Sequence, residues 1–347
     1  MRAMWCEESQ KVELRQIPIH EVGDDDVLIK VAYAAICPWD VRAYSGLSKS
    51  VKFPRILGHE LSGTVAAFGK NVKNLEVGQP VTPDMIIKCG GCKACRSGRP
   101  NKCRNVIFLQ FGGGFADYVC IPQRNVHVLR PGTSLKAAAF MEPLACVTRG
   151  QDMLNLYPGE VEIVVGLGPI GLMHMQVARA FGARVIASDP IPERLAKAAK
   201  LGAERVVNPN EEDLAAVVDT FTGGWGADAA VITVGSARLV EQVIPTLAPG
   251  GRLNIFAGIY PQDIAQIDPN IIHYQELILT GSADSTPGNM DRALEFIQNG
   301  QVDTESLISH LFPLQELSKG FEVVKERQGL KIMIEVNGEP AECCAIQ

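Results

Sequence analysis

The stretch VEIVVGLGPIGLMHMQVARAFGARVIASD, residues 161–189, decides the fold of this 347-residue chain. A short apolar run passes into Gly166-x-Gly168-x-x-Gly171, an amphipathic helical pattern and a second apolar run that ends at Asp189. This order predicts one strand–helix–strand unit. In such a unit the first glycine permits a tight turn, the second lets a pyrophosphate approach the backbone, and the third lets the helix pack on the sheet.

The glycine-rich turn and the acid after it together predict a dinucleotide site. Phosphates bind at a helix N-terminus, where unpaired N–H groups and the helix dipole favour anions. A carboxylate about twenty residues after the glycines can accept hydrogen bonds from the adenosine ribose and repels a 2′-phosphate, so NAD is expected rather than NADP. A glycine-rich turn can also merely close a strand–helix corner, but the flanking strand, helix and acid favour cofactor binding. The expected cofactor residues are Gly166, Gly168, Pro169, Ile170, Gly171 and Asp189.

Composition and charge narrow the class of protein. A hydrophobic content of 46% and a charged content of 21% are typical of a globular protein with about two domains. The net charge of -6 argues against a nucleic-acid partner, because phosphate binding relies on a basic surface. No apolar run approaches the ~20 residues of a membrane span, and residues 1–10 lack the core of a signal peptide. We therefore expect a cytoplasmic protein.

Four of the ten cysteines have the spacing of a metal site. Cys89, Cys92, Cys95 and Cys103 form C-x2-C-x2-C-x7-C within residues 88–104, a loop rich in glycine and basic residues. Four thiolates at this spacing can close a tetrahedral zinc shell, and the basic surround compensates the charge of such a site. Two disulfides or four unrelated thiols are the alternatives, and a reducing cytoplasm disfavours the disulfides. We interpret five other cysteines as ordinary thiols: Cys6, Cys120, Cys146, Cys343 and Cys344.

The chain is expected to hold two domains of different pattern. Up to about residue 140, short apolar runs alternate with turn residues, which is typical of a β-rich domain. From residue 161, strands and helices alternate and give the six strands of a doubly wound parallel sheet, an α/β class. This alternation ends beyond residue 285, and the tail is expected to return to the first domain. The predicted division is 1–150 with 285–347, and 151–284.

A second group of residues has the donor types of a catalytic metal site. Cys37 ends a predicted strand, His59 and Glu60 lie in a Gly-His-Glu motif, and Glu142 opens Glu-Pro-Leu. A thiolate, an imidazole and a carboxylate can hold zinc while leaving a position open for substrate oxygen. Singly, these residues could be a buried thiol, a core histidine and solvated acids. Their presence on one chain with a dinucleotide motif and a four-cysteine loop favours a metal site.

These motifs occur in the order found in one known family. The chain resembles the zinc-dependent medium-chain alcohol dehydrogenases, nearest the sorbitol, threonine and sugar-alcohol branch. The resemblance covers nearly the whole chain. It implies a GroES-like catalytic domain interrupted by a Rossmann domain, with the active site in the cleft between them. It also implies a homo-oligomer, either a dimer or a tetramer.

The resemblance implies roles for individual residues around the metal. Cys37 and His59 would be zinc ligands, and Glu60 or Glu142 would be the third ligand or hold zinc-bound water. Asp40 would orient His59 by accepting its other ring N–H. In the second domain, Arg194 matches a residue that touches the adenosine ribose. Lys331, in the tail, matches one near the pyrophosphate.

The sequence departs from the family at two positions that usually pass the alcohol proton outward. Trp39 and Arg42 stand where serine or threonine and histidine are usual. Neither can accept a proton at neutral pH, so a carboxylate, Glu60 or Glu142 acting through water, is expected to take this role. Trp39 could merely pack and Arg42 could pair with a surface acid. Alternatively, Trp39 forms an apolar wall for a ring substrate, and Arg42 donates to a hydroxyl pair or an anionic group.

The sequence thus predicts an NAD-dependent zinc enzyme that oxidises a secondary alcohol of a polyol, cyclitol or sugar-like substrate to a ketone. The expected cofactors are NAD and two zinc ions, one catalytic and one structural. A hydroxy-amino acid such as L-threonine is the alternative substrate. The alternative class is a non-catalytic zinc- and NAD-binding regulatory protein, which would have no need of Cys37, His59 and Glu142.

Overall fold

The protein divides into two compact units. The computed structural model describes residues 1–48, 51–109 and 111–339, and Cys343 and Cys344 lie outside these ranges. One unit comprises Met1–Glu142 with Asp303–Gln347, and the other comprises Pro143–Val302.

The unit boundaries differ from the expected 150/151 and 284/285, because two helices belong to the second unit. These are α4 (Met141–Leu154), which crosses the first boundary, and α10 (Pro287–Gln298). Hydrogen bonds join the two helices: Asn289 Nδ2 donates to Asp152 Oδ2 over 2.9 Å, and Thr148 Oγ1 donates to the backbone carbonyl of Asn289 over 3.4 Å. Helical pattern alone did not indicate this pairing.

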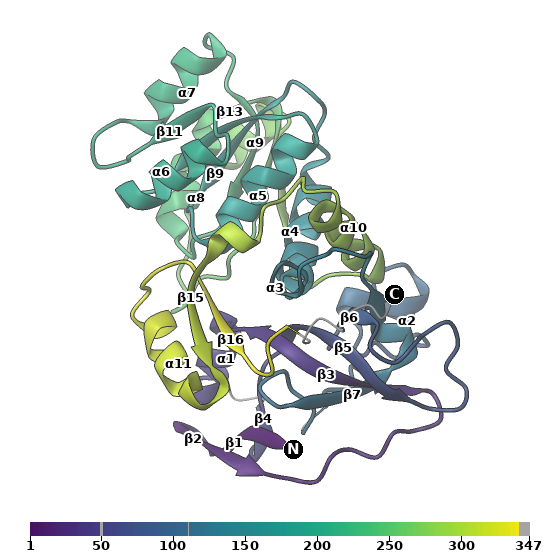
Figure 1. The fold of residues 1–347 in the computed structure, drawn as a ribbon. Helices are drawn as coiled ribbons and strands as arrows, with labels where there is room; N and C mark the ends of the chain where they lie inside the picture. Colours follow the sequence, from purple (N-terminus) through teal and green to yellow (C-terminus); the bar gives the residue numbers. More distant parts are fainter. Residues whose placement is uncertain (49–50, 110, 340–347) are drawn as a thin grey trace. The chain divides into compact units, whose positions relative to one another are not determined.

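The second unit is built on one parallel sheet of six strands, in the order β11-β10-β9-β12-β13-β14 (Figure 1). This is the order of a doubly wound dinucleotide-binding fold, so the predicted α/β class is confirmed. All five residues of β9 are buried, as expected of a central parallel strand with both faces covered. The strands are β9 (Val161–Val165), β10 (Arg184–Ser188), β11 (Arg205–Val207), β12 (Ala227–Ile232), β13 (Leu247–Ile255) and β14 (Ile278–Gly281).

Helices connect these strands, and local sequence sets several of their ends. Asp213, Ser236 and Thr286 each accept a hydrogen bond from a backbone N–H of the first turn that follows. Gly223, at φ 65°, ends α7 in the left-handed conformation that glycine adopts at little cost. The helices besides α4 and α10 are α5 (Pro169–Ala180), α6 (Pro192–Lys200), α7 (Leu214–Thr222), α8 (Ala237–Val243), η3 (Ile244–Thr246) and α9 (Pro269–Tyr274).

The core of the second unit contains a buried polar cluster. Gln151 Nε2 donates to Glu162 Oε1 over 2.9 Å and lies 3.0 Å from Nδ1 of His174. Burial raises the pKa of Glu162 to about 8 and lowers the pKa of His174 to about 3. Both side chains are therefore neutral at pH 7, which is the form that a buried group without a full counter-charge adopts.

The first unit is built around a seven-stranded sheet. Its strands follow the order β15-β16-β3-β5-β6-β8, and β7 pairs with β3. A three-stranded sheet, in the order β2-β1-β4, completes the unit. The strands are β1 (Arg2–Glu8), β2 (Lys11–Gln16), β3 (Asp26–Ala35), β4 (Arg55–Ile56), β5 (Glu60–Phe68), β6 (Pro80–Pro83), β7 (Tyr118–Pro122), β8 (Val126–Val128), β15 (Ile308–Pro313) and β16 (Lys331–Glu335).

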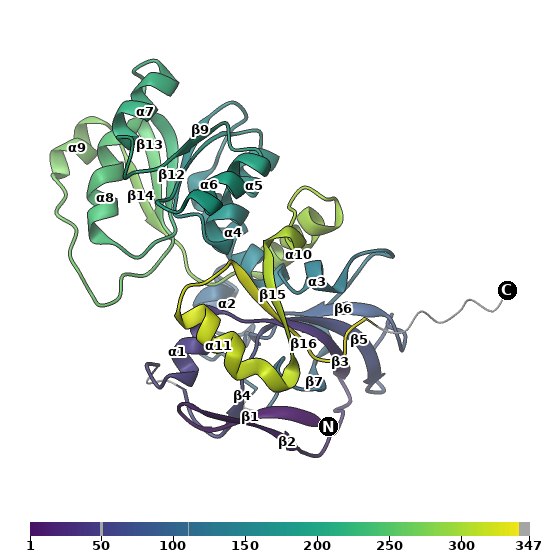
Figure 2. The same ribbon diagram turned by 60° about the vertical axis from the view of Figure 1, so that its left-hand side comes forward.

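From Asp303 the chain returns to this unit, whereas residues 285–302 of the expected tail belong to the second unit. Figure 2 shows β15 and β16, drawn in yellow, beside β3, drawn in purple. β16 pairs antiparallel with β3, and β15 pairs parallel with β16. The helices of this unit are α1 (Pro38–Tyr44), α2 (Lys93–Arg96), η1 (Pro100–Lys102), η2 (Gln123–Asn125), α3 (Leu135–Ala138), η4 (Glu305–Leu307), η5 (Leu314–Glu316) and α11 (Leu317–Lys325).

Among the described residues, no helix combines the length and the apolar character that crossing a membrane requires.

Candidate functional site

Strand pairing brings the predicted catalytic metal ligands together. Cys37 lies between β3 and α1, and His59 immediately precedes β5. Because β3 and β5 are antiparallel, with Ala35 opposite Glu60, the end of one strand meets the start of the other. Ligand atoms of Cys37, His59 and Glu60 all lie within 4.8 Å of one another. A thiolate, an imidazole and a carboxylate at this spacing fit a zinc ion with an open position.

Asp40 lies next to this cluster and is fully buried. Its Oδ2 accepts a hydrogen bond from the backbone N–H of Cys37 over 3.0 Å, and its Oδ1 accepts one from Gly58 over 3.2 Å. Oδ1 also lies 3.3 Å from Nδ1 of His59. Asp40 can therefore hold Nδ1 and leave Nε2 of His59 for a metal, the role that the resemblance implied.

Charges around His59 change the pKa values of the ligands. Burial, partly offset by His59, raises the pKa of Cys37. Burial opposes a charge on His59, but Asp40 and Cys37 outweigh it and raise the pKa of His59. Without a metal the pair therefore favours a protonated imidazole beside a thiol. A bound zinc ion would take the place of both protons.

Lys331 lies against the metal cluster. Its Nζ forms an ion pair with Oε2 of Glu60, and both side chains are at most 6% exposed. Lys331 Nζ also lies 5.9 Å from the ring centre of Phe140. Burial opposes the charge on Lys331, but Glu60 outweighs it and raises the pKa of the lysine. The structure therefore shows Lys331 in contact with Glu60. The expected role of Lys331 near the pyrophosphate stays a prediction.

Glu142 lies outside the three-residue cluster but close to its charges. Burial raises the pKa of Glu142 to about 7, with Glu60 and Asp84 acting in the same direction and His59 and Lys331 acting against them. Between Glu60 and Glu142, the structure places Glu60 nearer to Cys37 and His59.

An aromatic side chain and an arginine extend from the metal cluster. The Trp39 ring packs edge-on against His59, with ring centres 5.7 Å apart, and remains 37% exposed. The guanidinium of Arg55 lies over the ring of Trp39, 6.0 Å from the ring centre. Arg42 lies in the last turn of α1, where it interacts with other residues of the chain. Sequence reasoning did not select Arg55, although it lies only four residues before His59.

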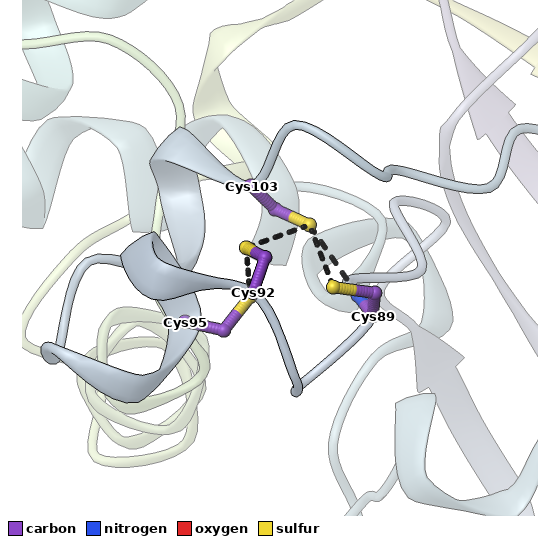
Figure 3. Close-up of side chains that lie close together, drawn as sticks. All are labelled: Cys89, Cys92, Cys95 and Cys103. Carbon is purple, nitrogen blue, oxygen red and sulfur yellow. Dashed lines mark hydrogen bonds between the residues drawn. The ribbon is translucent and has the colours of Figure 1, made fainter.

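The four cysteines of the predicted structural site face one another (Figure 3). Sulfur–sulfur distances are 3.5 Å for Cys92–Cys95, 3.9 Å for Cys92–Cys103 and 3.5 Å for Cys103–Cys89. A tetrahedral zinc site with Zn–S bonds of about 2.3 Å requires sulfur atoms ~3.8 Å apart, whereas a disulfide would bring them to about 2.0 Å. The four sulfur atoms therefore fit one zinc ion.

Backbone N–H groups in this loop favour a thiolate at Cys92, whereas burial and the neighbouring sulfur atoms raise the pKa of Cys95 to about 12. The backbone N–H groups of Cys95 and Arg104 lower the pKa of Cys92 to about 6. The N–H of Cys89 donates to the sulfur of Cys103 over 3.4 Å. The loop thus supplies donors to its sulfur atoms even though it has little apolar core, and a bound zinc ion would hold it in one shape.

The glycine-rich turn of the second unit has the geometry of a phosphate site. Gly166 has φ 90°, and a Cβ there would lie 2.4 Å from Val234 Cγ2. A Cβ on Gly171 would lie 1.8 Å from the carbonyl oxygen of Gly166, so only glycine allows α5 to pack this closely. At Gly168 a Cβ would meet no described protein atom within 4 Å. That open space before the N-terminus of α5 fits a bound pyrophosphate.

Asp189 follows β10, beside this turn, and is 3% exposed. Its Oδ2 accepts a hydrogen bond from the N–H of Leu167 over 2.7 Å, and its Oδ1 accepts one from Ile191 over 2.9 Å. Arg194 Nη1 lies 3.6 Å from Oδ2. Asp189 therefore both holds the turn and brings a guanidinium to the place where the adenosine ribose is expected.

Two family models match the chain. Residues 23–131 match the "Alcohol dehydrogenase GroES-like domain", and residues 169–299 match the "Zinc-binding dehydrogenase" model. The D-arabitol-phosphate dehydrogenase of Enterococcus avium is 34% identical over 93% of this chain and 93% of its own length. The L-threonine 3-dehydrogenase of Bacillus velezensis is 33% identical over 92% of this chain and 94% of its own length.

The fold has close counterparts among solved structures. A zinc-binding dehydrogenase from Sinorhizobium meliloti 1021, bound to NADP, superimposes with a TM-score of 0.89. It is 29% identical, and the match covers 96% of this chain and 99% of that one.

Proposed function

Because the chain belongs to the zinc-dependent medium-chain alcohol dehydrogenases, we propose that it oxidises a secondary alcohol of a polyol, cyclitol or sugar-like substrate to a ketone, with NAD as the acceptor. The observation that carries this proposal is the cluster of Cys37, His59 and Glu60, on a chain that also has the glycine-rich turn. When bound, zinc would polarise the alcohol oxygen, and the nicotinamide would accept a hydride.

The residues of this chain have distinct roles in the proposal. Cys37, His59 and one carboxylate hold the metal, and Asp40 fixes the ring of His59. Glu60 or Glu142 takes the alcohol proton through water, because Trp39 offers no acceptor. The pH profile of kcat in Glu60→Gln and Glu142→Gln tests this step. A profile that changes in neither variant would remove both carboxylates from the proton path.

In this proposal, two residues beside the metal ligands contact the substrate and determine which substrate is accepted. Trp39 is partly exposed and touches His59, which supports a role as an apolar wall for the C–H face of the substrate. Arg42 would donate to a pair of hydroxyls. Arg42→Ala should then raise KM, and Trp39→Ser should lower the efficiency with ring substrates without creating activity on simple alcohols. An unchanged KM together with good turnover of short linear alcohols would contradict these roles.

In the second unit, Asp189 and Arg194 bind the adenosine ribose, and the open face at Gly168 receives the pyrophosphate. Asp189 supports NAD over NADP, although one related structure holds NADP. The same proposal includes a second, structural zinc ion held by the four cysteines. It also includes a homo-oligomeric, cytoplasmic protein.

A screen of polyols, cyclitols, sugars and amino acids for NAD reduction tests the function directly. Turnover of L-threonine above all polyols would favour the hydroxy-amino acid alternative, which the threonine dehydrogenase relative supports. A protein that binds NADH but oxidises no alcohol in this screen would instead be a regulatory protein.

A further inference from the structure

Arg55 is a partly buried cation beside the substrate site. The carboxylate of Asp40 favours its charge from nearby, but that carboxylate is already held by Cys37, Gly58 and His59. The Nε of Arg55 is buried and has no hydrogen-bond partner. Among residues 1–48, 51–109 and 111–339 Arg55 forms no ion pair, and its guanidinium lies over the face of Trp39. A partly buried cation that no acid contacts directly is costly, so structures rarely keep one without a use.

Other cations of this chain show what Arg55 lacks. Arg15 also lies over a tryptophan, 5.6 Å from the ring centre of Trp5, but it pairs with Glu7 over 2.7 Å and with Glu13. Three other cations with largely buried side chains each pair with an acid: Lys88 pairs with Asp84 over 2.5 Å, Arg252 pairs with Glu160 over 2.5 Å, and Lys331 pairs with Glu60.

The position of Arg55 relative to the metal ligands suits a substrate of several carbons. Trp39 contacts both Arg55 and His59, at 6.0 Å and 5.7 Å from its ring centre respectively. The guanidinium and the imidazole are therefore at most about 12 Å apart. An extended covalent chain advances ~1.2 Å per bond, so a chain of four to six carbons with an oxygen at each end spans ~6 to ~8 Å, which falls within that limit.

We propose that Arg55 is the anion-binding residue of the substrate site, and that the substrate is a polyol or sugar derivative with a terminal oxyanion. Phosphate and carboxylate share this chemistry, because each presents paired oxygens to the planar fork of a guanidinium. The face of Trp39 holds the guanidinium in place, so little conformational entropy is lost on binding. The inference rests on the proposed dehydrogenase function.

The test compares substrates that differ only in charge. Values of kcat/KM with NAD are measured for a pentitol, for the same pentitol with a terminal phosphate, and for the corresponding aldonic acid. The wild-type protein is expected to favour one of the two anions over the neutral pentitol by about 10- to 100-fold, the usual effect of a charge-assisted bidentate contact. The arm that wins identifies phosphate or carboxylate.

Variants of two tryptophan-stacked arginines separate the role of Arg55 from a structural one. Arg55→Gln should reduce the preference for the anion by about 10- to 100-fold, mainly through KM, and Arg55→Lys should retain part of it. Arg15→Gln removes a stacked guanidinium that lies on Trp5 and should leave the preference unchanged. Zinc content and melting temperature confirm that each variant is folded, and Arg55→Lys carries the test if Arg55→Gln does not fold.

Two results would overturn the inference: an equal anion preference in wild type and Arg55→Gln, or a wild-type protein that favours the neutral pentitol. A failure of the dehydrogenase proposal looks different, because then no alcohol, neutral or charged, reduces NAD. In that case the pentitol phosphate and the aldonic acid should still raise the melting temperature of the wild-type protein more than that of Arg55→Gln. Equal shifts would reject the anion site as well.

Discussion

Asp40 Oδ1 lies 3.3 Å from Nδ1 of His59, and the same carboxylate accepts hydrogen bonds from the backbone N–H groups of Cys37 and Gly58. One buried acid thus ties together the two segments that carry the metal ligands. Its carboxylate fixes both the backbone before α1 and the ring orientation before β5. Removing it should loosen the metal site without touching a ligand.

We expect Asp40→Ala to lower the affinity for the catalytic zinc by about 10- to 100-fold, the usual effect of losing such a partner. Dialysis against a graded chelator, followed by elemental analysis, measures this loss. Asp24→Ala is a suitable control, because Asp24 is exposed and pairs with Lys70. Equal zinc retention in Asp40→Ala and the control would show that His59 needs no such support.

The four-cysteine loop should lose its zinc as a unit. In Cys95→Ser we expect one zinc ion per chain instead of two, and a lower melting temperature, because an opened tetrahedral site no longer holds the loop. Cys120→Ser is the control, since Cys120 lies on β7 and outside the cluster. A wild-type protein with one zinc ion or none after careful purification would contradict the two-metal scheme.

Cofactor choice should change at Asp189. Replacing Asp189 by serine removes the charge that repels a 2′-phosphate while Arg194 stays nearby, so the ratio of kcat/KM for NAD to that for NADP should fall by at least about tenfold. Steady-state kinetics with both cofactors measure the ratio. A wild-type enzyme that already prefers NADP would show that Asp189 only holds the turn.

The ion pair between Lys331 and Glu60 should be costly to break from one side. Lys331→Met leaves a buried carboxylate without its counter-charge and should lower the free energy of unfolding by about 3–5 kcal/mol. Urea unfolding of this variant and of the double variant Lys331→Met, Glu60→Gln gives the comparison. The double variant should recover part of the loss, and equal stability of the two would contradict a coupled pair. NAD affinity of Lys331→Met separately tests the predicted role near the pyrophosphate.

The buried cluster of the second unit predicts how stability depends on pH. The pKa of Glu162 rises from 4.5 in the unfolded chain to about 8 in the folded unit. Between these values the folded state binds more protons than the unfolded state, so stability falls as pH rises towards 8. For His174, whose pKa falls from 6.5 to about 3, stability instead falls as pH drops below 6.5. Of these two groups, only Glu162 acts between pH 6.5 and 8.

In that window the loss should be about 1–2 kcal/mol, from a slope of at most ~1.4 kcal/mol per pH unit. Glu162→Gln keeps an oxygen for Gln151 and cannot ionise, so its unfolding free energy should vary less from pH 6.5 to 8. Urea titrations at several pH values measure both proteins. Parallel curves would mean that Glu162 does not titrate in this range.

Much of the fold could be predicted because its signals are local. Gly166 adopts a positive φ, Gly168 leaves an open face for a phosphate, and Gly171 lets the helix approach the strand closely. Each of these properties depends on a few consecutive residues. Alternation of apolar runs predicted the six parallel strands, and donor type and spacing predicted the four-cysteine cluster. In these cases the chemistry of the side chain and its near neighbours on the chain was sufficient. The ligand roles of Cys37 and His59 came from the resemblance to the family, which left Glu60 and Glu142 as alternatives.

Only the tertiary structure decided which distant residues meet. The hairpin β1–β2 and strand β15 had no clear pattern, because pairing with neighbouring strands, rather than local preference, stabilises them. Lys331 meets Glu60 because β16 pairs with β3, which in turn pairs with β5. Arg55, in β4, meets Trp39, in α1, although sixteen positions separate them in the chain. The residue type alone determines the charge of a side chain. Whether that charge finds a partner depends on strand pairings between residues far apart in the chain, and no local pattern predicts those pairings.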